Sequence, residues 1–300
     1  MFKKKVLLGI SAVFIMILMS ILFFGIETEI CKNTHIVDSA KEPELLEEIK
    51  EYSNLEGGVR LLGIEQDKKY KAKVAFLIDD LGNGGEGTEE MMTIDRPMTF
   101  AVMPFMKYSK RDAENAHQKG YEVIVHLPME TRKNSTIGLG GGAIRTSQTD
   151  KEIESFVLNA FKDVPHAVGA NNHMGVLASS DRRVMNAVIS VLKKKNKYIV
   201  DSKTTPKSVI SEIARKHEVP VIEMSVFLDN EKEMDTIRRQ INLLAYSALK
   251  RGYAIGIGHV GPLGGSNTAG VIKELIPELE KKGIKIVFVS ELMKDKYEKK

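Results

Sequence analysis

The chain has 300 residues, of which 43% are hydrophobic, and it is therefore long and apolar enough to bury a sizeable core in one large domain with appendages. Lys3, Lys4 and Lys5 supply most of the formal net charge of +4, and the remainder of the chain has 41 basic and 40 acidic residues. This near-neutral balance argues against a nucleic-acid-binding protein. The single cysteine, Cys31, can form no internal disulfide and leaves no cysteine for a zinc finger or a thiol enzyme.

An uncharged apolar stretch, residues 6–26, follows the three lysines. At about 1.5 Å rise per residue, a helix of this length crosses a bilayer core of about 30 Å. Glu27, Thr28 and Glu29 stand where a small-residue cleavage site would follow. We therefore expect residues 1–26 to be an uncleaved signal anchor with cytoplasmic lysines and the rest of the chain extracytoplasmic, secreted if the anchor is cleaved after all.

The segment 27–70 is polar and charged, with a proline, two adjacent glycines and one amphipathic stretch at 45–52. This composition predicts a linker with a short helix that holds the main domain, residues 71–300, away from the membrane.

From residue 71 onward, short apolar runs alternate with longer helical patterns. The runs that predict strands lie near 74–78, 99–103, 122–125, 167–170, 198–200, 221–224, 254–257 and 285–289. The helical patterns lie near 109–119, 150–161, 181–195, 207–217, 231–250 and 268–282. Such alternation indicates an α/β domain with a parallel sheet. Seven or eight units in about 230 residues suit a closed or nearly closed (β/α) barrel, and an open doubly wound sheet is the alternative.

Four of the predicted strands end in residues that carry acid, base or metal chemistry. The first runs directly into Asp79 and Asp80, and others lead into His126, His173 and His259. Two adjacent carboxylates raise each other's pKa and cost stability unless a cation or a proton lies between them. Both candidate folds place their active site at the carboxyl ends of the strands, so we expect these five residues to meet there.

The individual residues differ in how strongly they suggest a function. Asp79 and Asp80 could serve a turn, but a turn needs only one side-chain acceptor. His126 and His173 are the expected metal ligands, and His259 is the expected proton donor or acceptor. Glu130, four residues after His126, is a lesser candidate that could position a neighbour, because Pro128 makes a regular helix doubtful there.

Several other motifs carry less weight. Asp201 also ends a predicted strand, and a site role and a turn role are equally open for it. The glycine-rich run at 138–143 lacks the strand-to-helix context of a dinucleotide motif, so we expect a mobile loop over the site. The serines lack the G-x-S-x-G elbow, so we do not expect a serine hydrolase. We expect no site role for four further histidines, His35, His117, His166 and His217.

Seven short motifs follow one another in a specific order. They are IDDLG at 78–82, TFAVMP at 99–104, HLPME at 126–130, NNHMG at 171–175, VDS at 200–202, VFLDN at 226–230 and IGH at 257–259. On these motifs the chain resembles the divergent polysaccharide deacetylase family over roughly residues 73–294. The resemblance implies a distorted (β/α) barrel related to the metal-dependent carbohydrate deacetylases.

The resemblance also implies roles for individual residues. Asp79 would be the base and Asp80 a metal ligand, because those enzymes carry such a pair after their first strand. His126 matches the first histidine of their His-x-x-x-His ligand pair, and His259 matches their late-strand acid. Glu130 replaces the second histidine, and their Arg-x-Pro stretch has no obvious counterpart here. We therefore expect His173 to complete an Asp/His/His set for a divalent metal such as zinc, with an open position for water.

The predicted function is removal of an N- or O-acetyl group from an extracytoplasmic polysaccharide, such as a peptidoglycan-like cell-wall glycan. Two alternatives belong to other classes. A carbohydrate-binding or regulatory protein could keep the barrel without turnover, and the altered ligand pattern supports this reading. Glycoside hydrolysis by paired carboxylates is the weakest alternative, because it leaves three histidines unexplained.

Overall fold

The protein is described from a computed structural model, which covers residues 70–298. These residues belong to one compact unit, Ile49–Lys300. The signal anchor predicted for residues 1–26 lies outside the described residues. The same holds for the predicted linker, residues 27–70, except for residue 70. Within 70–298, no helix combines the length and the apolar character that a membrane span needs.

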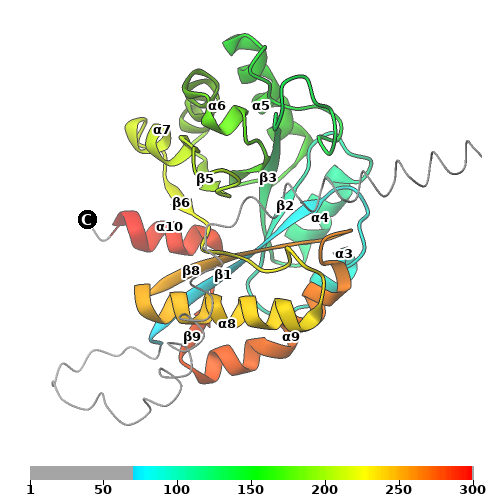
Figure 1. Ribbon diagram of the computed structural model, residues 1–300, viewed down its shortest axis with the longest axis vertical. Helices are drawn as coiled ribbons and strands as arrows, with labels where there is room; N and C mark the ends of the chain where they lie inside the picture. Colours follow the sequence, from blue (N-terminus) through cyan, green and yellow to red (C-terminus); the bar gives the residue numbers. More distant parts are fainter. Residues whose placement is uncertain (1–69, 299–300) are drawn as a thin grey trace, which may run out of the picture. The chain divides into compact units, whose positions relative to one another are not determined.

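Strands and helices alternate along the chain (Figure 1). The strands are β1 (Ala72–Leu81), β2 (Thr99–Val102), β3 (Glu122–Met129), β4 (Gly169–Met174), β5 (Tyr198–Asp201), β6 (Val221–Glu223), β7 (Val226–Phe227), β8 (Tyr253–His259) and β9 (Ile284–Ile286). The helices are α3 (Thr88–Met91), α4 (Ser109–Gln118), α5 (Asp150–Asp163), η2 (Ala178–Ser180), α6 (Arg182–Lys194), α7 (Ile210–Lys216), α8 (Met234–Arg251), α9 (Gly265–Lys281) and α10 (Val289–Glu298).

All strand pairs are parallel, and the strand order identifies the architecture. The order is β6-β5-β4-β3-β2-β1-β8-β7, and β9 pairs with the start of β1. From β1 to β6, strands that follow each other in the chain are therefore neighbours, and β8 returns to β1, as in a barrel and unlike a doubly wound sheet. No ladder joins β6 to β7 within the described residues, so the barrel is open there. The predicted parallel α/β fold is confirmed in this form.

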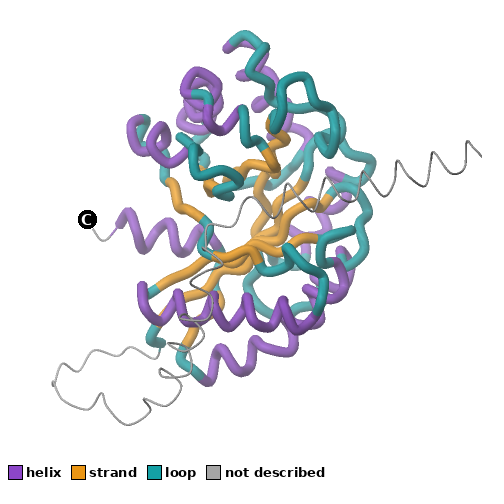
Figure 2. Tube along the Cα trace, in the orientation of Figure 1, coloured by secondary structure: helices purple, strands orange, loops and turns teal. Residues whose placement is uncertain are grey.

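The strands carry two apolar faces, which explains why their sequences read as continuous apolar runs. On β1, Val74, Phe76 and Ile78 belong to the outer core under the helices, whereas Ala75 and Leu77 belong to a separate inner core. Figure 2 shows the strands surrounded by helices. Because side chains alternate along a strand, the next inward position on β1 after Leu77 is Asp79.

Helix α10 closes the inner core at the amino-terminal ends of the strands. Its residues Val289, Leu292 and Met293 pack with Ala75 and Ile255. The sequence predicted a strand at 285–289 and missed this helix. A short apolar run such as 286–289 does not distinguish a strand from a buried helix start.

Glu122 fixes this closure by polar contacts. One oxygen of its carboxylate accepts hydrogen bonds from Thr99 Oγ1 (2.9 Å), Tyr198 Oη (2.9 Å) and the Ser290 amide (3.2 Å). Since these partners begin β2, β5 and α10, one side chain joins two strands to the closing helix.

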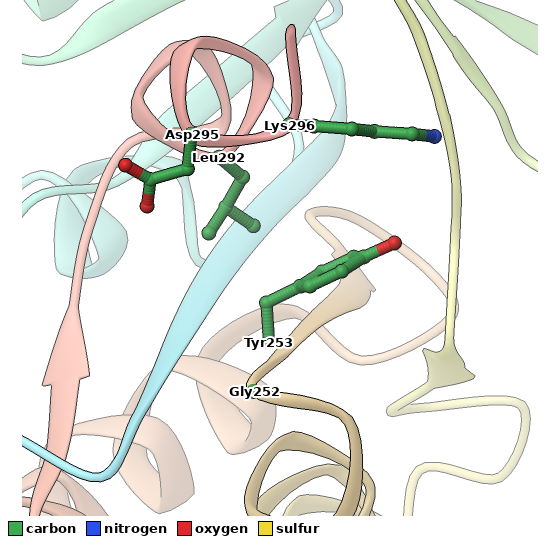
Figure 3. Close-up of a pocket in the computed structure, with 5 residues that line it drawn as sticks. All are labelled: Gly252, Tyr253, Leu292, Asp295 and Lys296. Carbon is green, nitrogen blue, oxygen red and sulfur yellow. The ribbon is translucent and has the colours of Figure 1, made fainter. Parts of the chain in front are cut away.

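A cavity of about 230 Å³ lies at the same closed end. It is lined by Leu292, Asp295 and Lys296 of α10 and by Gly252 and Tyr253, where α8 leads into β8 (Figure 3). Asp295 is paired with Lys73 at the start of β1 (2.5 Å). This cavity is therefore at the opposite ends of the strands from Asp79, His126 and His259.

Truncation of Leu292 to alanine should measure how much the closing helix stabilises the barrel. Leu292 is 2% exposed within the inner core, so Leu292→Ala should lower the free energy of unfolding by about 2–4 kcal/mol. Urea titration of the full-length chain measures this change. The control Lys294→Ala, on the exposed side of α10, should change it by less than about 0.5 kcal/mol. Equal stability of the two variants would contradict the packing role of α10.

Candidate metal and catalytic site

The interior of the barrel changes from apolar to polar at the carboxyl ends of its strands. On β1, β3 and β8, the apolar inward residues Leu77, Ile124 and Ile257 are each followed two positions later by a titratable residue. These three residues are Asp79, His126 and His259. Strand register places Asp79 beside His259 and His126 beside Asn171 of β4.

Asp80 reaches the same side as Asp79 through a backbone distortion. Its φ is 69°, in the left-handed region, and the β1–β2 register shifts between Ile78 and Leu81. An L-residue pays for this conformation, although Asp tolerates it better than most. Because the strand is irregular here, two consecutive carboxylates can face one site, which regular alternation would forbid.

The ring orientation of His126 leaves one nitrogen free to act as a ligand. Its Nδ1 lies 2.8 Å from Asn171 Oδ1 in a buried setting. An amide oxygen only accepts, so Nδ1 carries the hydrogen and donates it. In the neutral ring, Nε2 then carries the lone pair, and it lies 3.3 Å from Asp80 Oδ1.

His173 presents its other nitrogen in the same way. Its Nε2 donates to the carbonyl oxygen of Gly138 (2.8 Å), so the lone pair of the neutral ring is on Nδ1. That Nδ1 lies 3.0 Å from His126 Nε2 and 3.2 Å from Asp80 Oδ1. In the neutral rings, two nitrogen lone pairs and a carboxylate oxygen therefore converge.

These three atoms fit a cation. Asp80, His126 and His173 form the one group of potential ligands found in residues 70–298, with ligand atoms within 4.8 Å of one another. Asp80 Oδ1 is buried and accepts no hydrogen bond. A buried oxygen without a donor is costly, and a cation at this point would satisfy it together with both imidazole lone pairs. The site is thus a candidate site for a divalent metal.

Electrostatics in the cluster agree with a site that attracts positive charge. Burial raises the pKa of Asp80, but the imidazoles of His173 and His126 more than offset it and hold that pKa well below its usual range. Burial lowers the pKa of His126, but Asp79 and Asp80 reverse this and raise it. A metal ion at this candidate site would therefore compete with a proton for Nε2 of His126.

Asp79 differs from Asp80 in its surroundings. It is 2% exposed, and its two oxygens accept hydrogen bonds from Asn171 Nδ2 at 2.9 and 3.1 Å. Burial raises the pKa of Asp79, and the nearby His126 and His259 oppose this only in part. A carboxylate with a raised pKa next to a metal site is suited to accept a proton.

His259 is oriented by a buried carboxylate. Its Nδ1 donates to Asp229 Oδ1 (2.7 Å), and its backbone amide donates to Asp229 Oδ2 (2.7 Å), which also accepts from Thr268 Oγ1 (2.8 Å). Burial lowers the pKa of His259, but Asp229 outweighs it and raises that pKa to about 10. Nε2 of this ring therefore carries a hydrogen at neutral pH.

Glu130 is not among the candidate ligands and instead orders the loop that contacts His173. It is 1% exposed and accepts hydrogen bonds from the Asn134 amide (2.8 Å), the Thr146 amide (2.9 Å) and Thr146 Oγ1 (2.7 Å). These partners stand at both ends of the glycine-rich loop that supplies the Gly138 carbonyl to His173. Glu130 thus positions a ligand indirectly, as the sequence allowed.

The glycines of this loop allow close packing as well as unusual dihedral angles. A Cβ on Gly140 would lie 2.7 Å from Met106 Sδ, and one on Gly141 would lie 2.5 Å from the Phe105 carbonyl oxygen. The loop therefore rests directly on the segment after β2. The mobility predicted for it stays a prediction.

The remaining candidates have structural roles. Asp201 accepts hydrogen bonds from the Lys203 amide and Ser208 Oγ within the turn after β5, which fits the turn alternative. His117 stacks on His166, and His217 contacts Asn186. His35 lies outside the described residues.

Sequence reasoning assigned no role to two residues that the structure places in the site. Asn171 links His126 to Asp79, and Asp229 orients His259. Both lie in the motifs that carry the family resemblance, NNHMG and VFLDN. Their presence in these motifs was the available signal. Recognition of their roles also required the directions of their side chains, on β4 and after β7.

A parallel barrel with acids and imidazoles at the carboxyl ends of its strands has the fold of the polysaccharide deacetylases. The divergent polysaccharide deacetylase family matches residues 76–293, and the chain belongs to this family.

Three similar proteins illustrate the relationship. The uncharacterized protein YibQ of Escherichia coli K12 is 32% identical over 207 residues, which cover 69% of this chain and 63% of YibQ. The chain therefore spans less than two thirds of that relative. The uncharacterized protein ATU2773 from Agrobacterium tumefaciens C58 has a similar crystal structure, with a TM-score of 0.69, 20% identity, and coverage of 81% of this chain and 94% of that chain. The Bc1960 peptidoglycan N-acetylglucosamine deacetylase shares the fold at a TM-score of 0.50 and 14% identity, with coverage of 76% and 89%.

Replacement of Glu130 by glutamine should loosen the loop without removing a ligand. In Glu130→Gln, the side-chain nitrogen is a donor and cannot accept a hydrogen bond. It would face one of the three groups that now donate to Glu130, so one end of the loop should detach. We expect faster tryptic cleavage at Arg132 and Lys133 and a free energy of unfolding lowered by about 1–3 kcal/mol. Glu278→Gln, at an exposed position of α9, is the control, and cleavage at the wild-type rate in Glu130→Gln would contradict this role.

Proposed function

We propose that this protein is a metal-dependent hydrolase that removes acetyl groups from an extracytoplasmic polysaccharide or cell-wall glycan. The observation that carries the proposal is the convergence of Asp80 Oδ1, His126 Nε2 and His173 Nδ1 beside the carboxylate of Asp79. One candidate metal site, one candidate base and one candidate acid therefore share the end of the barrel where such folds hold their catalytic residues.

Asp80, His126 and His173 would hold the metal, and their mixed nitrogen and oxygen donors suit zinc. A bound divalent ion would supply Lewis-acid polarisation of the acetyl carbonyl and would acidify a water molecule. Three protein ligands leave room for this chemistry, as in other catalytic zinc sites.

Asp79 and His259 would move the protons. Asp79 Oδ2 accepts the proton of the attacking water, and burial prepares it for this task by raising its pKa. The acyl C–N or C–O bond then breaks, and His259 Nε2 donates its proton to the departing nitrogen or oxygen. The products are acetate and a free amino or hydroxyl group on the sugar. Asp229 keeps His259 protonated before this step and directs Nε2 toward the barrel mouth.

Several observations support a glycan as the substrate class. The chain belongs to the divergent polysaccharide deacetylase family, and a protein that shares its fold is a peptidoglycan N-acetylglucosamine deacetylase. The N-terminal sequence supports an extracytoplasmic protein held at the membrane by residues 1–26. We include this location and a peptidoglycan-like partner in the proposal.

The alternative is a catalytically inactive carbohydrate-binding protein on the same barrel. Its main support is Glu130, which stands where related deacetylases carry a second histidine ligand. His173, on the adjacent strand β4, offers a nitrogen that could take that place. The complete set of donors favours the enzyme.

Metal content tests the candidate ligand set. We expect the full-length chain to bind zinc stoichiometrically and His126→Ala and His173→Ala each to lose it, because two remaining ligands hold zinc poorly. Elemental analysis and release of acetate from N-acetylated glycan are the two measurements. His217→Ala, a histidine bonded to Asn186 away from the site, is the matched control. Full zinc content and full acetate release in both site variants would refute the proposal.

The pH dependence of hydrolysis tests the acid. Asp229 holds the pKa of His259 at about 10, so the protonated acid is present at neutral pH and is lost as the pH rises toward that value. In Asp229→Asn the charge is absent and the pKa falls, so the basic limb of kcat/KM should move to lower pH by at least about one unit.

The control for this shift is Thr268→Val, which removes only a hydrogen bond to Asp229. It should move the limb much less than Asp229→Asn. An unchanged basic limb in Asp229→Asn would assign the acid to another group.

A further inference from the structure

We infer that Asn171 is a positioning residue that couples the metal ligand His126 to the base Asp79. Its side-chain amide determines which nitrogen of His126 is offered to the metal, and the same amide holds the Asp79 carboxylate in place. The inference rests on the proposed function. It adds a residue for which the sequence analysis found no role.

Asn171 has no solvent contact, and every polar atom of its side chain has a partner. It is 0% exposed and points into the barrel from β4, in register with His126 of β3. Its Oδ1 lies 2.8 Å from His126 Nδ1, and its Nδ2 lies 2.9 and 3.1 Å from the two oxygens of Asp79 and 3.2 Å from Ser202 Oγ.

These contacts allow only one orientation of the amide. An ionised carboxylate only accepts hydrogen bonds, so the donor side of the amide, Nδ2, must face Asp79. The acceptor side, Oδ1, must then face His126. If the amide were reversed, its oxygen would face the carboxylate oxygens of Asp79 without a hydrogen between them, in a buried site where unmatched polar atoms are costly.

This orientation determines the tautomer of His126. Because Oδ1 accepts, Nδ1 must carry the hydrogen, and the lone pair of the neutral ring stays on Nε2 beside Asp80 and His173. The negative charge of Asp79 therefore selects, through the amide of Asn171, which nitrogen of His126 is available as a ligand. A partner of this kind on the far nitrogen of a histidine ligand typically changes metal affinity by about 10–100-fold.

Asn172 provides a matched control on the same strand. It is equally buried, at 1% exposed, but its side chain points to the other face of the sheet. Its Nδ2 donates to the Met174 carbonyl and Thr204 Oγ1, and its Oδ1 accepts from the Ser202 amide. Asn172 therefore holds loop backbone, and its hydrogen bonds go to neither His126 nor Asp79.

Replacement of Asn171 by aspartate separates the two roles. The carboxylate in Asn171→Asp can still accept from His126 Nδ1–H, so it keeps the ligand tautomer. It cannot donate to Asp79 and instead places a like charge against it. Asn171→Ala removes both contacts, and a merely structural residue would not respond differently to these two changes.

The experiment compares zinc affinity and turnover in the full-length chain. Zinc affinity is measured by competition with a chromogenic chelator, which needs no turnover, and kcat is measured as acetate release from an N-acetylated glycan. We expect Asn171→Ala to lose zinc affinity by about 10–100-fold and Asn171→Asp to retain it within about threefold. Both variants should lose kcat by at least about 100-fold. Asn172→Ala should show lower thermal stability with zinc affinity within about threefold of the wild type.

Two results would overturn the inference and leave the proposed function intact. One is wild-type zinc affinity in Asn171→Ala, and the other is an equal loss of zinc affinity in Asn171→Asp and Asn171→Ala. Retained turnover in Asn171→Asp would overturn the link to Asp79. A wild-type chain that binds no zinc would instead refute the proposed function, and this inference with it.

Discussion

The alternation of side chains along parallel strands is the constraint on which this structure depends. Each strand can direct only every second residue into the barrel, and the interior is narrow. In this chain, those positions are apolar as far as Leu77, Ile124 and Ile257, and then become polar within two residues. The same strands therefore form an apolar core toward their amino-terminal ends and a polar site at their carboxyl ends, and the packing of the inner core determines where the polar groups lie.

The candidate metal site uses this constraint in an unusual way. Asp80 lies out of phase with the alternation and reaches the site through a left-handed backbone conformation. Glu130, four residues after His126, anchors a loop. Because that loop supplies the Gly138 carbonyl that accepts a hydrogen bond from His173, Glu130 acts on a candidate ligand through the backbone.

The sequence predicted the architecture well because its signals are local. Apolar runs that end in charge identified the strands and the end of the barrel that carries the site, and five of the predicted site residues lie together there. The helix α10 was missed because its apolar start continues the pattern of β9. Asn171 and Asp229 were missed for another reason: an amide or a carboxylate at a strand end is common, and only the three-dimensional partners of each reveal what it orients.

The three candidate ligands are far apart in the sequence. His126 and His173 are 47 residues apart and come from different strands, and Asp80 lies farther upstream on a third strand. Two histidines close together in the sequence could bind a metal ion even in an unfolded chain. The present set comes together only in the folded barrel. An ion bound there would favour the folded state, because these three ligand atoms converge only when the barrel has formed. The compartment in which the chain folds would therefore determine the pool from which the ion is taken.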